Sequence, residues 1–247
     1  MVWLVKRSLT SEITRPSWPI EITRVPFRPV TGRVTTLSGT NIVDPTNAIE
    51  FGLGENGVEN GALKLSQKNA GGNHFTISGL NLGTGDFTIV TKLYIDSLIG
   101  NKNSSTYLFG IGNETDPLGN VKDVKSPYFN ISYKYSSFGG GSNHVRFVAN
   151  GVVNEKSADA NTNFIPYGQW VEVIVIRNKN VVTLYITPEG RRGTTSSISV
   201  TLSSAEAINF TETCNLAFSG NSGCQNGSPD TYTYYDEISV YDYALDH

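Results

Sequence analysis

The feature that most constrains the fold is a period-two alternation of apolar and polar side chains over residues 86–95. This period buries one face of a strand and leaves the other to solvent. Residues 171–176 and 181–186 repeat the strand pattern around the polar segment 177–180, which predicts a hairpin with a four-residue turn. Other strand-like runs cover 62–65, 74–77, 106–111, 128–133, 144–149, 197–202, 214–219 and 232–243, and only 203–208 favours a helical turn. Strands at this spacing, with no amphipathic helix between them, predict an all-β sandwich or barrel.

Composition agrees with this prediction and excludes several classes of protein. Of the 247 residues, 38% are hydrophobic and 17% are charged, which suits short strands joined by polar turns and excludes helical bundles, coiled coils and disordered chains. The net charge of −3 argues against a general nucleic-acid binder. No apolar run approaches the ~18–20 residues that cross a bilayer, so we expect no membrane insertion.

Charge divides the chain into two unequal parts. Residues 1–36 carry a net charge of +4, whereas residues 37–247 carry −7. Four prolines within the first part exclude a helix there and disfavour a central strand. We therefore expect an extended basic N-terminal arm over 1–36 and one β-sandwich over 37–247.

The arm contains a short internal repeat. The sequence EITRPSW at 12–18 is followed nine residues later by EITRVPF at 21–27. A nine-residue step returns to the same face of a polyproline helix, so the repeat predicts tandem docking motifs for another protein subunit. The alternative is a chance repeat in an arm that packs on its own body. The candidate docking residues are aromatic or basic: Trp3, Arg15, Trp18, Arg24, Phe27 and Arg33.

The start of the chain does not read as a secretory signal. Residues 1–5 are apolar, but Lys6 and Arg7 interrupt them before a hydrophobic region forms. We expect a virion protein that is made in the host cytoplasm without a signal peptide, and an extracellular protein numbered from an added methionine is the alternative. Cys214 and Cys224 could close one disulfide or remain free thiols, and both readings stay open.

Five segments resemble, in order, the laminin-G-like domains of the concanavalin A-like lectin/glucanase superfamily. They are GDFTI at 85–89, YLFGIG at 107–112, GQWVEV at 168–173, LAFSG at 216–220 and YDEISVYDYAL at 235–245. The resemblance implies a jelly-roll β-sandwich of two stacked antiparallel sheets. Within it we expect five side chains to be buried, namely Trp170, Val173, Val175, Leu184 and Ile186.

The resemblance alone does not decide the activity, because this fold hosts lectins, hydrolases and adhesion modules. Relatives that cleave glucans carry an acid-x-acid-x-x-acid strand, and its nearest match here begins at Glu114 and Asp116. Gly119 replaces the third acid, and Pro117 would interrupt a strand, so we expect a polar turn and no enzyme. The histidines, His74, His144 and His247, lie in no recognisable catalytic triad.

No cofactor is expected from the sequence. Calcium stays an open alternative, because laminin-G-like and legume-type relatives bind it and oxygen-rich loops occur at 113–116, 120–123 and 226–230. None of these loops has the spaced acids of a dedicated site.

Aromatic side chains next to amides predict a sugar-binding surface, and the alternative is that they are core residues and surface decoration. The candidates are Tyr133, Tyr135, Phe138, Asn143 and Tyr232. We hypothesise a non-enzymatic, multicopy adhesion or structural subunit, with the arm joining a lectin-like domain to a bacteriophage virion and a cell-surface glycan as a second partner. A secreted carbohydrate-binding module or adhesin is the alternative, and a degenerate glycoside hydrolase a third reading.

Overall fold

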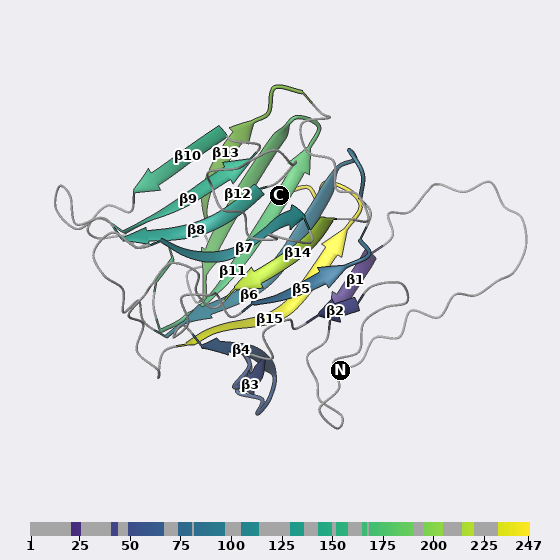
Figure 1. Cartoon of the computed structure of the whole chain (residues 1–247). Helices are drawn as coiled ribbons and strands as arrows, with labels where there is room; N and C mark the ends of the chain where they lie inside the picture. The colour runs from purple at the N-terminus through teal and green to yellow at the C-terminus, as the bar shows by residue number, and fades with distance from the viewer. Residues whose placement is uncertain are drawn as a thin grey trace, which may run out of the picture.

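A computed structural model gives the fold (Figure 1). It describes residues 21–25, 41–43, 49–66, 74–80, 82–96, 105–113, 129–135, 143–149, 152–157, 165–166, 168–189, 195–204, 214–219 and 232–247.

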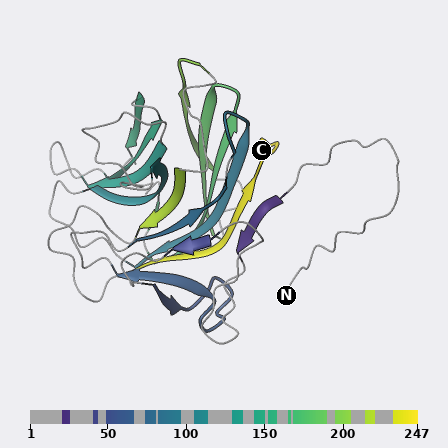
Figure 2. The same cartoon turned by 45° about the vertical axis from the view of Figure 1, so that its right-hand side comes forward.

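The described strands form two antiparallel sheets. The eight-stranded sheet has the order β13 (Ser196–Thr201), β12 (Val181–Pro188), β11 (Trp170–Asn178), β6 (Phe87–Ile95), β15 (Tyr232–Tyr241), β4 (Ala62–Ser66) and β3 (Glu50–Gly52), with β1 (Glu21–Val25) also paired to β15. The seven-stranded sheet has the order β10 (Val152–Ser157), β9 (Asn143–Ala149), β8 (Phe129–Tyr135), β7 (Ser105–Asn113), β14 (Cys214–Ser219), β5 (His74–Ser78) and β2 (Asn41–Val43). Figure 2 shows them as two stacked layers, so the predicted all-β, concanavalin A-like jelly-roll sandwich is confirmed.

The core lies between the two sheets and follows the alternation in the sequence. On β6, Phe87, Ile89 and Leu93 are buried, whereas Lys92 and Tyr94 on either side of Leu93 are only partly covered. Tyr235 of β15 packs edge-on against Phe75 and Phe218 of the opposite sheet, with ring centroids 6.1 and 5.2 Å away. The five side chains predicted to be buried, Trp170, Val173, Val175, Leu184 and Ile186, are all buried.

The hairpin of β11 and β12 corrects one prediction. The strands pair through Asn178 and Val181, so Lys179 and Asn180 alone form the turn. Arg177 belongs to the strand rather than the turn and is 0% exposed. Its Nε donates to the Lys179 carbonyl at 3.2 Å, and Lys179 has a positive φ of 55°. A two-residue turn with left-handed geometry matches the twist of the flanking strands, which explains why the predicted four-residue turn is wrong.

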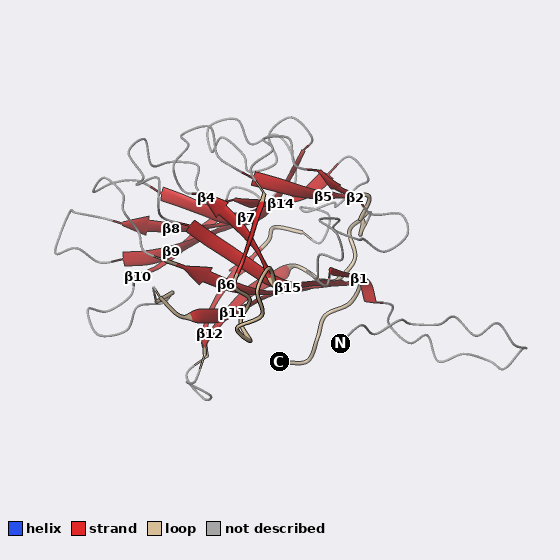
Figure 3. Ribbon diagram, turned by 90° about the horizontal axis from the view of Figure 1, so that it is seen from below, coloured by secondary structure: helices blue, strands red, loops and turns tan. Residues whose placement is uncertain are grey.

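Strand β15 is paired along both edges. Its residues 233–241 pair with β6, while its other edge pairs first with β4, through residues 232–235, and then with β1, through residues 238–241. The register shifts between Asp236 and Ser239, where Glu237 has a positive φ of 50°. The short segment Glu21–Val25 therefore belongs to the sheet, although it lies upstream of the boundary predicted at residue 36 (Figure 3).

The last residues of the chain cross the outer face of the eight-stranded sheet. The Leu245 N–H donates to Thr88 Oγ1 at 3.0 Å, and Thr88 Oγ1 donates to the Tyr243 carbonyl at 2.8 Å. The His247 ring stacks on Tyr185 of β12 with centroids 4.1 Å apart. The described residues contain no helix that is long and apolar enough to span a membrane.

Candidate functional site

The predicted docking residues fall mostly on parts of the chain that the structure does not describe. Trp3, Arg15, Trp18, Phe27 and Arg33 lie outside the described residues. Arg24 lies in β1, where its Cα is the register partner of Ser239 in β15. The role of the arm in docking stays a prediction.

The predicted sugar-binding residues divide between the two sheets. Tyr135 of β8 and Asn143 of β9 are register partners, and Tyr133 pairs with Val145 on the same two strands. Tyr232, in contrast, begins β15 of the other sheet. Phe138 lies outside the described residues. The structure thus brings Tyr135 and Asn143 together, and it places Tyr232 in separate surroundings.

Tyr232 belongs to a cluster of aromatic residues on the outer face of the eight-stranded sheet. We call this cluster of Tyr94, Trp170, Tyr232 and Tyr234 the aromatic patch. Thr233 and Tyr235 of β15 are buried, so alternation turns Tyr232 and Tyr234 outward. The same alternation on β6 turns Tyr94 outward next to the buried Leu93.

Strand register brings the members of the aromatic patch into contact. Tyr94 is the register partner of Trp170 on one side and of Tyr234 on the other. The ring centroids of Tyr94 and Trp170 are 5.4 Å apart, and those of Tyr94 and Tyr234 are 5.5 Å apart in an edge-to-face arrangement. The Tyr232 ring follows at 6.2 Å from Tyr234. Trp170 is only 9% exposed, so it supports the Tyr94 ring, while the other three members, Tyr94, Tyr232 and Tyr234, are half-buried.

A glycine makes room for the centre of the patch. A Cβ on Gly52 would lie 2.6 Å from Cε1 of Tyr234, closer than any side chain tolerates. The glycine in β3 therefore lets the Tyr234 ring lie against the neighbouring backbone.

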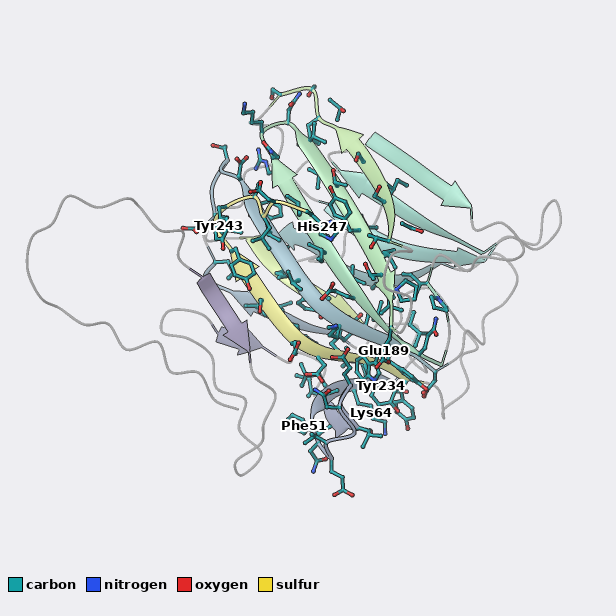
Figure 4. The ribbon with its side chains drawn as sticks, turned by 180° about the vertical axis from the view of Figure 1, so that it is seen from behind. Phe51, Lys64, Glu189, Tyr234, Tyr243 and His247 are labelled. Carbon is teal, nitrogen blue, oxygen red and sulfur yellow. The ribbon has the colours of Figure 1, made fainter. Side chains whose placement is uncertain are left out.

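Charged groups border the aromatic patch at the same end of the sheet (Figure 4). Lys64 of β4 is the register partner of Tyr234, and its Nζ lies 3.7 Å from the centre of the Tyr232 ring. The same Nζ pairs with Glu50 Oε2 at 3.0 Å. On the opposite side, the Glu189 N–H donates to the Trp170 carbonyl at 2.9 Å, which fixes this exposed glutamate next to the patch.

Asp96 contributes a carboxylate to the patch. Its Oδ2 accepts the Tyr232 N–H at 3.2 Å, and its own N–H donates to the Tyr232 carbonyl at 3.2 Å. Its Oδ1 makes no hydrogen bond within the described part of the chain. Burial raises the pKa of Asp96, although the Tyr232 N–H and the charge of Lys64 oppose this effect. Burial also raises the pKa of Tyr234 to about 12, and the Asp96 carboxylate adds to this rise.

A second group of carboxylates lies two residues further along the strands, next to Lys92 of β6. These carboxylates are engaged in contacts within the sheet and the segment before β4. Asp236 Oδ2 accepts the Glu55 N–H at 3.1 Å, and Oδ1 accepts the Glu237 N–H at 2.8 Å. Lys92 Nζ lies 3.1 Å from Glu55 Oε1 and 3.6 Å from Glu172 Oε2. Burial alone would lower the pKa of Lys92, but the hydrogen bond that it donates to Glu55 and the charges of the nearby carboxylates raise this pKa overall.

The remaining chemical candidates lie mostly outside the described residues. These include Glu114, Asp116, Phe138, Cys224 and most of the oxygen-rich loops. Among the residues that are described, no group of three metal-binding side chains converges. His74 opens β5 and His144 lies in β9, as expected for strand residues.

The comparisons with known proteins concern the fold. No family model matches the sequence, and no curated protein matches it. Peanut lectin with a nine-residue peptide superposes with a TM-score of 0.58 and 13% identity, over 91% of this chain and 97% of the lectin chain. The chain has the concanavalin A-like jelly-roll fold. The suspected resemblance is therefore confirmed at the level of the fold.

Other similar structures differ in what they are named for. The binding domain of botulinum neurotoxin serotype D has a TM-score of 0.58 and 13% identity. The match covers 92% of this chain and 49% of the toxin chain. The PL-14 alginate lyase from the marine Aplysia kurodai has a TM-score of 0.53 and 11% identity, over 90% of this chain and 98% of the lyase. Because these identities are low, the likeness establishes the fold alone. Ligands and activity have to be argued from the residues of the site.

Sequence reasoning identified Tyr232 and missed most of its neighbours. Tyr94, Trp170 and Lys64 come from three other strands, far from Tyr232 along the chain. Their alternation predicts an outward orientation, but only the register between strands shows that they meet. The pairing of Tyr94 with both Trp170 and Tyr234 brings the patch together, and the sequence alone does not reveal this pairing.

Proposed function

We propose that this chain is a non-catalytic glycan-recognition subunit, carried on a multimeric assembly by its N-terminal arm. The single observation that carries glycan recognition is the aromatic patch on a solvent-facing sheet, next to Asp96 Oδ1. Tyrosine rings offer apolar surface with a polar end, and a carboxylate oxygen accepts hydrogen bonds from hydroxyl groups. This combination suits a ring ligand that carries many hydroxyls. The lectin-like fold is a supporting argument by analogy.

The non-catalytic part of the proposal is supported by the way the neighbouring carboxylates are used. Both oxygens of Asp236 accept backbone N–H groups, and Glu55 and Glu172 pair with Lys92. Glycoside cleavage needs two carboxyl groups that are free to exchange protons with the substrate. The three carboxylates of the row next to the patch, Glu55, Glu172 and Asp236, are thus engaged in contacts within the structure.

The multimeric setting rests on the sequence of the arm. A basic segment with two tryptophans, ahead of an acidic body, suits attachment to other subunits. We propose a bacteriophage virion as the setting, with the protein as a decoration, baseplate or tail-fibre component, in several copies. A secreted carbohydrate-binding module or adhesin is the competing proposal. Co-purification of the chain with a large particle would support the first, and a soluble exported monomer would contradict it.

A glycan array tests the recognition function directly. The purified full-length chain should bind a defined subset of immobilised glycans, and free glycan of the same kind should compete. Tyr234→Ala should reduce the signal, whereas Tyr185→Phe, on the same sheet face outside the patch, should retain it. No reproducible binding to any glycan would overturn the proposal.

One comparison favours an enzyme as a second candidate, because the alginate lyase shares the fold over most of both chains. Alginate incubated with the full-length chain should show no new reducing ends and no unsaturated uronates. Turnover that is lost in Glu114→Gln/Asp116→Asn or in Asp96→Asn would replace the non-catalytic proposal with an enzymatic one.

A further inference from the structure

We propose that the aromatic patch selects uncharged glycans and rejects acidic ones. The inference rests on the proposed glycan-recognition function and adds the ligand class. It follows from the charges around the patch, from the way Lys64 at its border and Lys92 in the adjoining row are engaged, and from the polar atoms offered to a ligand.

Among the residues that the structure describes, acidic groups outnumber basic groups around the patch. Among the described residues at its border, Glu50, Asp96 and Glu189 accompany only one cation, Lys64. The adjoining row of the sheet repeats this excess, with three acids around a single lysine, namely Glu55, Glu172 and Asp236 around Lys92. Carboxylates on one face reinforce one another and lower the local concentration of anions. These described groups therefore repel an anionic ligand that approaches the patch.

Neither lysine is left to neutralise an acidic ligand. Lys64 is held by Glu50 at 3.0 Å and by the Tyr232 ring at 3.7 Å. Lys92 lies between Glu55 and Glu172, at 3.1 and 3.6 Å. A ligand carboxylate would have to compete with these contacts, and at Lys92 it would leave Glu55, whose side chain is 16% exposed, without its partner. Selectivity against anions follows from this unfavourable exchange.

The polar atoms of the half-buried Asp96 and tyrosines suit neutral hydroxyl groups. Asp96 Oδ1 is an acceptor, so a hydroxyl can donate to it, whereas a carboxylate would repel it. The hydroxyls of Tyr94 and Tyr234 can both donate and accept. An uncharged sugar ring can therefore satisfy the site without placing like charges together.

The shape of the patch indicates how such a ligand lies. Trp170, Tyr94 and Tyr234 follow one another across β11, β6 and β15, perpendicular to the strands. Neighbouring strands are about 4.8 Å apart, so these three span about 10 Å. Figure 4 shows Glu189 and Lys64 near Tyr234 at this end of the face, while Tyr243 and His247 lie toward the other end. The ligand would cross the strands between the two charged borders and offer more than one ring.

The first experiment compares short neutral glucan and galactan oligosaccharides with alginate oligosaccharides of matched length, using the full-length chain and titration calorimetry. A neutral oligosaccharide should bind at least ~10-fold more tightly than alginate, a difference of about 1.4 kcal/mol. Added salt should narrow the gap, because it screens the repulsion of alginate and leaves the neutral ligand unaffected.

Three substitutions locate the binding at the patch. Tyr94→Ala and Asp96→Asn should each weaken the neutral ligand by ~10-fold or more. Asp96→Asn keeps a carbonyl oxygen for the Tyr232 N–H while it removes the second acceptor, so the fold is retained. Tyr185→Phe, outside the patch, should bind as the wild type does. A thermal unfolding curve that matches the wild type shows that a variant has folded, and a variant without such a curve is set aside.

Charge reversal gives a gain of binding that misfolding cannot imitate. Glu50→Lys/Glu189→Lys should improve alginate binding by about tenfold, because it reverses two charges on the borders of the patch. Asp246→Lys makes the same kind of change near the C-terminal end and should leave alginate binding unaltered.

The outcomes separate this inference from the function on which it rests. If no glycan of either class binds, the proposed function is wrong and this inference is wrong with it. If neutral glycans bind but Tyr94→Ala and Asp96→Asn have no effect, or if alginate binds at least as tightly, glycan recognition stands and the selective patch is overturned.

Discussion

At the scale of single residues, Tyr235 joins the two sheets through its ring and its hydroxyl. The register between β7 and β8 shifts at Leu108, and the Leu108 carbonyl accepts the Tyr235 hydroxyl at 2.6 Å. Tyr235→Phe keeps the ring and leaves this buried carbonyl without its partner, so the free energy of unfolding should fall by about 1–3 kcal/mol. Urea unfolding would measure it, and Tyr185→Phe, at a partly exposed tyrosine, is the matched control. Equal stability of the two variants would show that the carbonyl finds another donor.

Tyr234 gives a prediction about pH at the same scale. Burial and then the Asp96 carboxylate raise the pKa of its phenol to about 12, above the usual value of about 10. The folded state therefore holds this proton more tightly than the unfolded state does. The corresponding stability is fully present below pH of about 10 and is lost as the pH rises through about 12. Ultraviolet titration of tyrosine should show a late-ionising phenol that disappears in Tyr234→Phe, and an unchanged titration curve would contradict the assignment.

At the scale of secondary-structure elements, the segment between β3 and β4 folds back on β15. A Cβ on Gly61 would lie 2.8 Å from the Val58 carbonyl oxygen and 3.2 Å from Cα of Gly54. Gly61→Ala should therefore displace this segment and weaken the Glu55 hydrogen bond to Asp236, at a cost of about 1–3 kcal/mol. Asn56→Ala, exposed on the same segment, should change the unfolding midpoint little. The reverse order of stabilities would refute the proposed close approach.

The elements also show what the sequence could and could not predict. Long alternating strands such as β6, β11 and β12 were recognisable because one face is buried and the other is not. β1, β2, β3 and β10 were missed, since pairing to a neighbour, rather than their own pattern, makes these segments strands. The aromatic patch was only partly predictable for a related reason. Its members are set by inter-strand register, and a shift of one residue would have turned each of them inward.

At the scale of the whole molecule, β1 separates two roles that a single deletion would confuse. Residues 1–36 include both the predicted docking tryptophans and the strand that covers residues 238–241 of β15. Removing 1–19 takes away Trp3, Arg15 and Trp18 and keeps β1, so the sandwich should retain its melting temperature. Removing 1–36 exposes backbone groups along β15, and a loss of 1–2 kcal/mol should lower the melting temperature by about 2–8 °C.

The same two truncations test the proposed assembly. The full-length chain should be multimeric by size-exclusion chromatography with light scattering, because the arm is proposed to join subunits. The variant lacking 1–19 should be monomeric and as stable as the full-length chain, since interface tryptophans commonly contribute at least ~2 kcal/mol each. Trp18→Ala should shift the equilibrium partway toward monomer, with Ser17→Ala as the neighbouring control. A full-length chain that is monomeric, or a truncated chain that still assembles, would show that the arm is not the anchor.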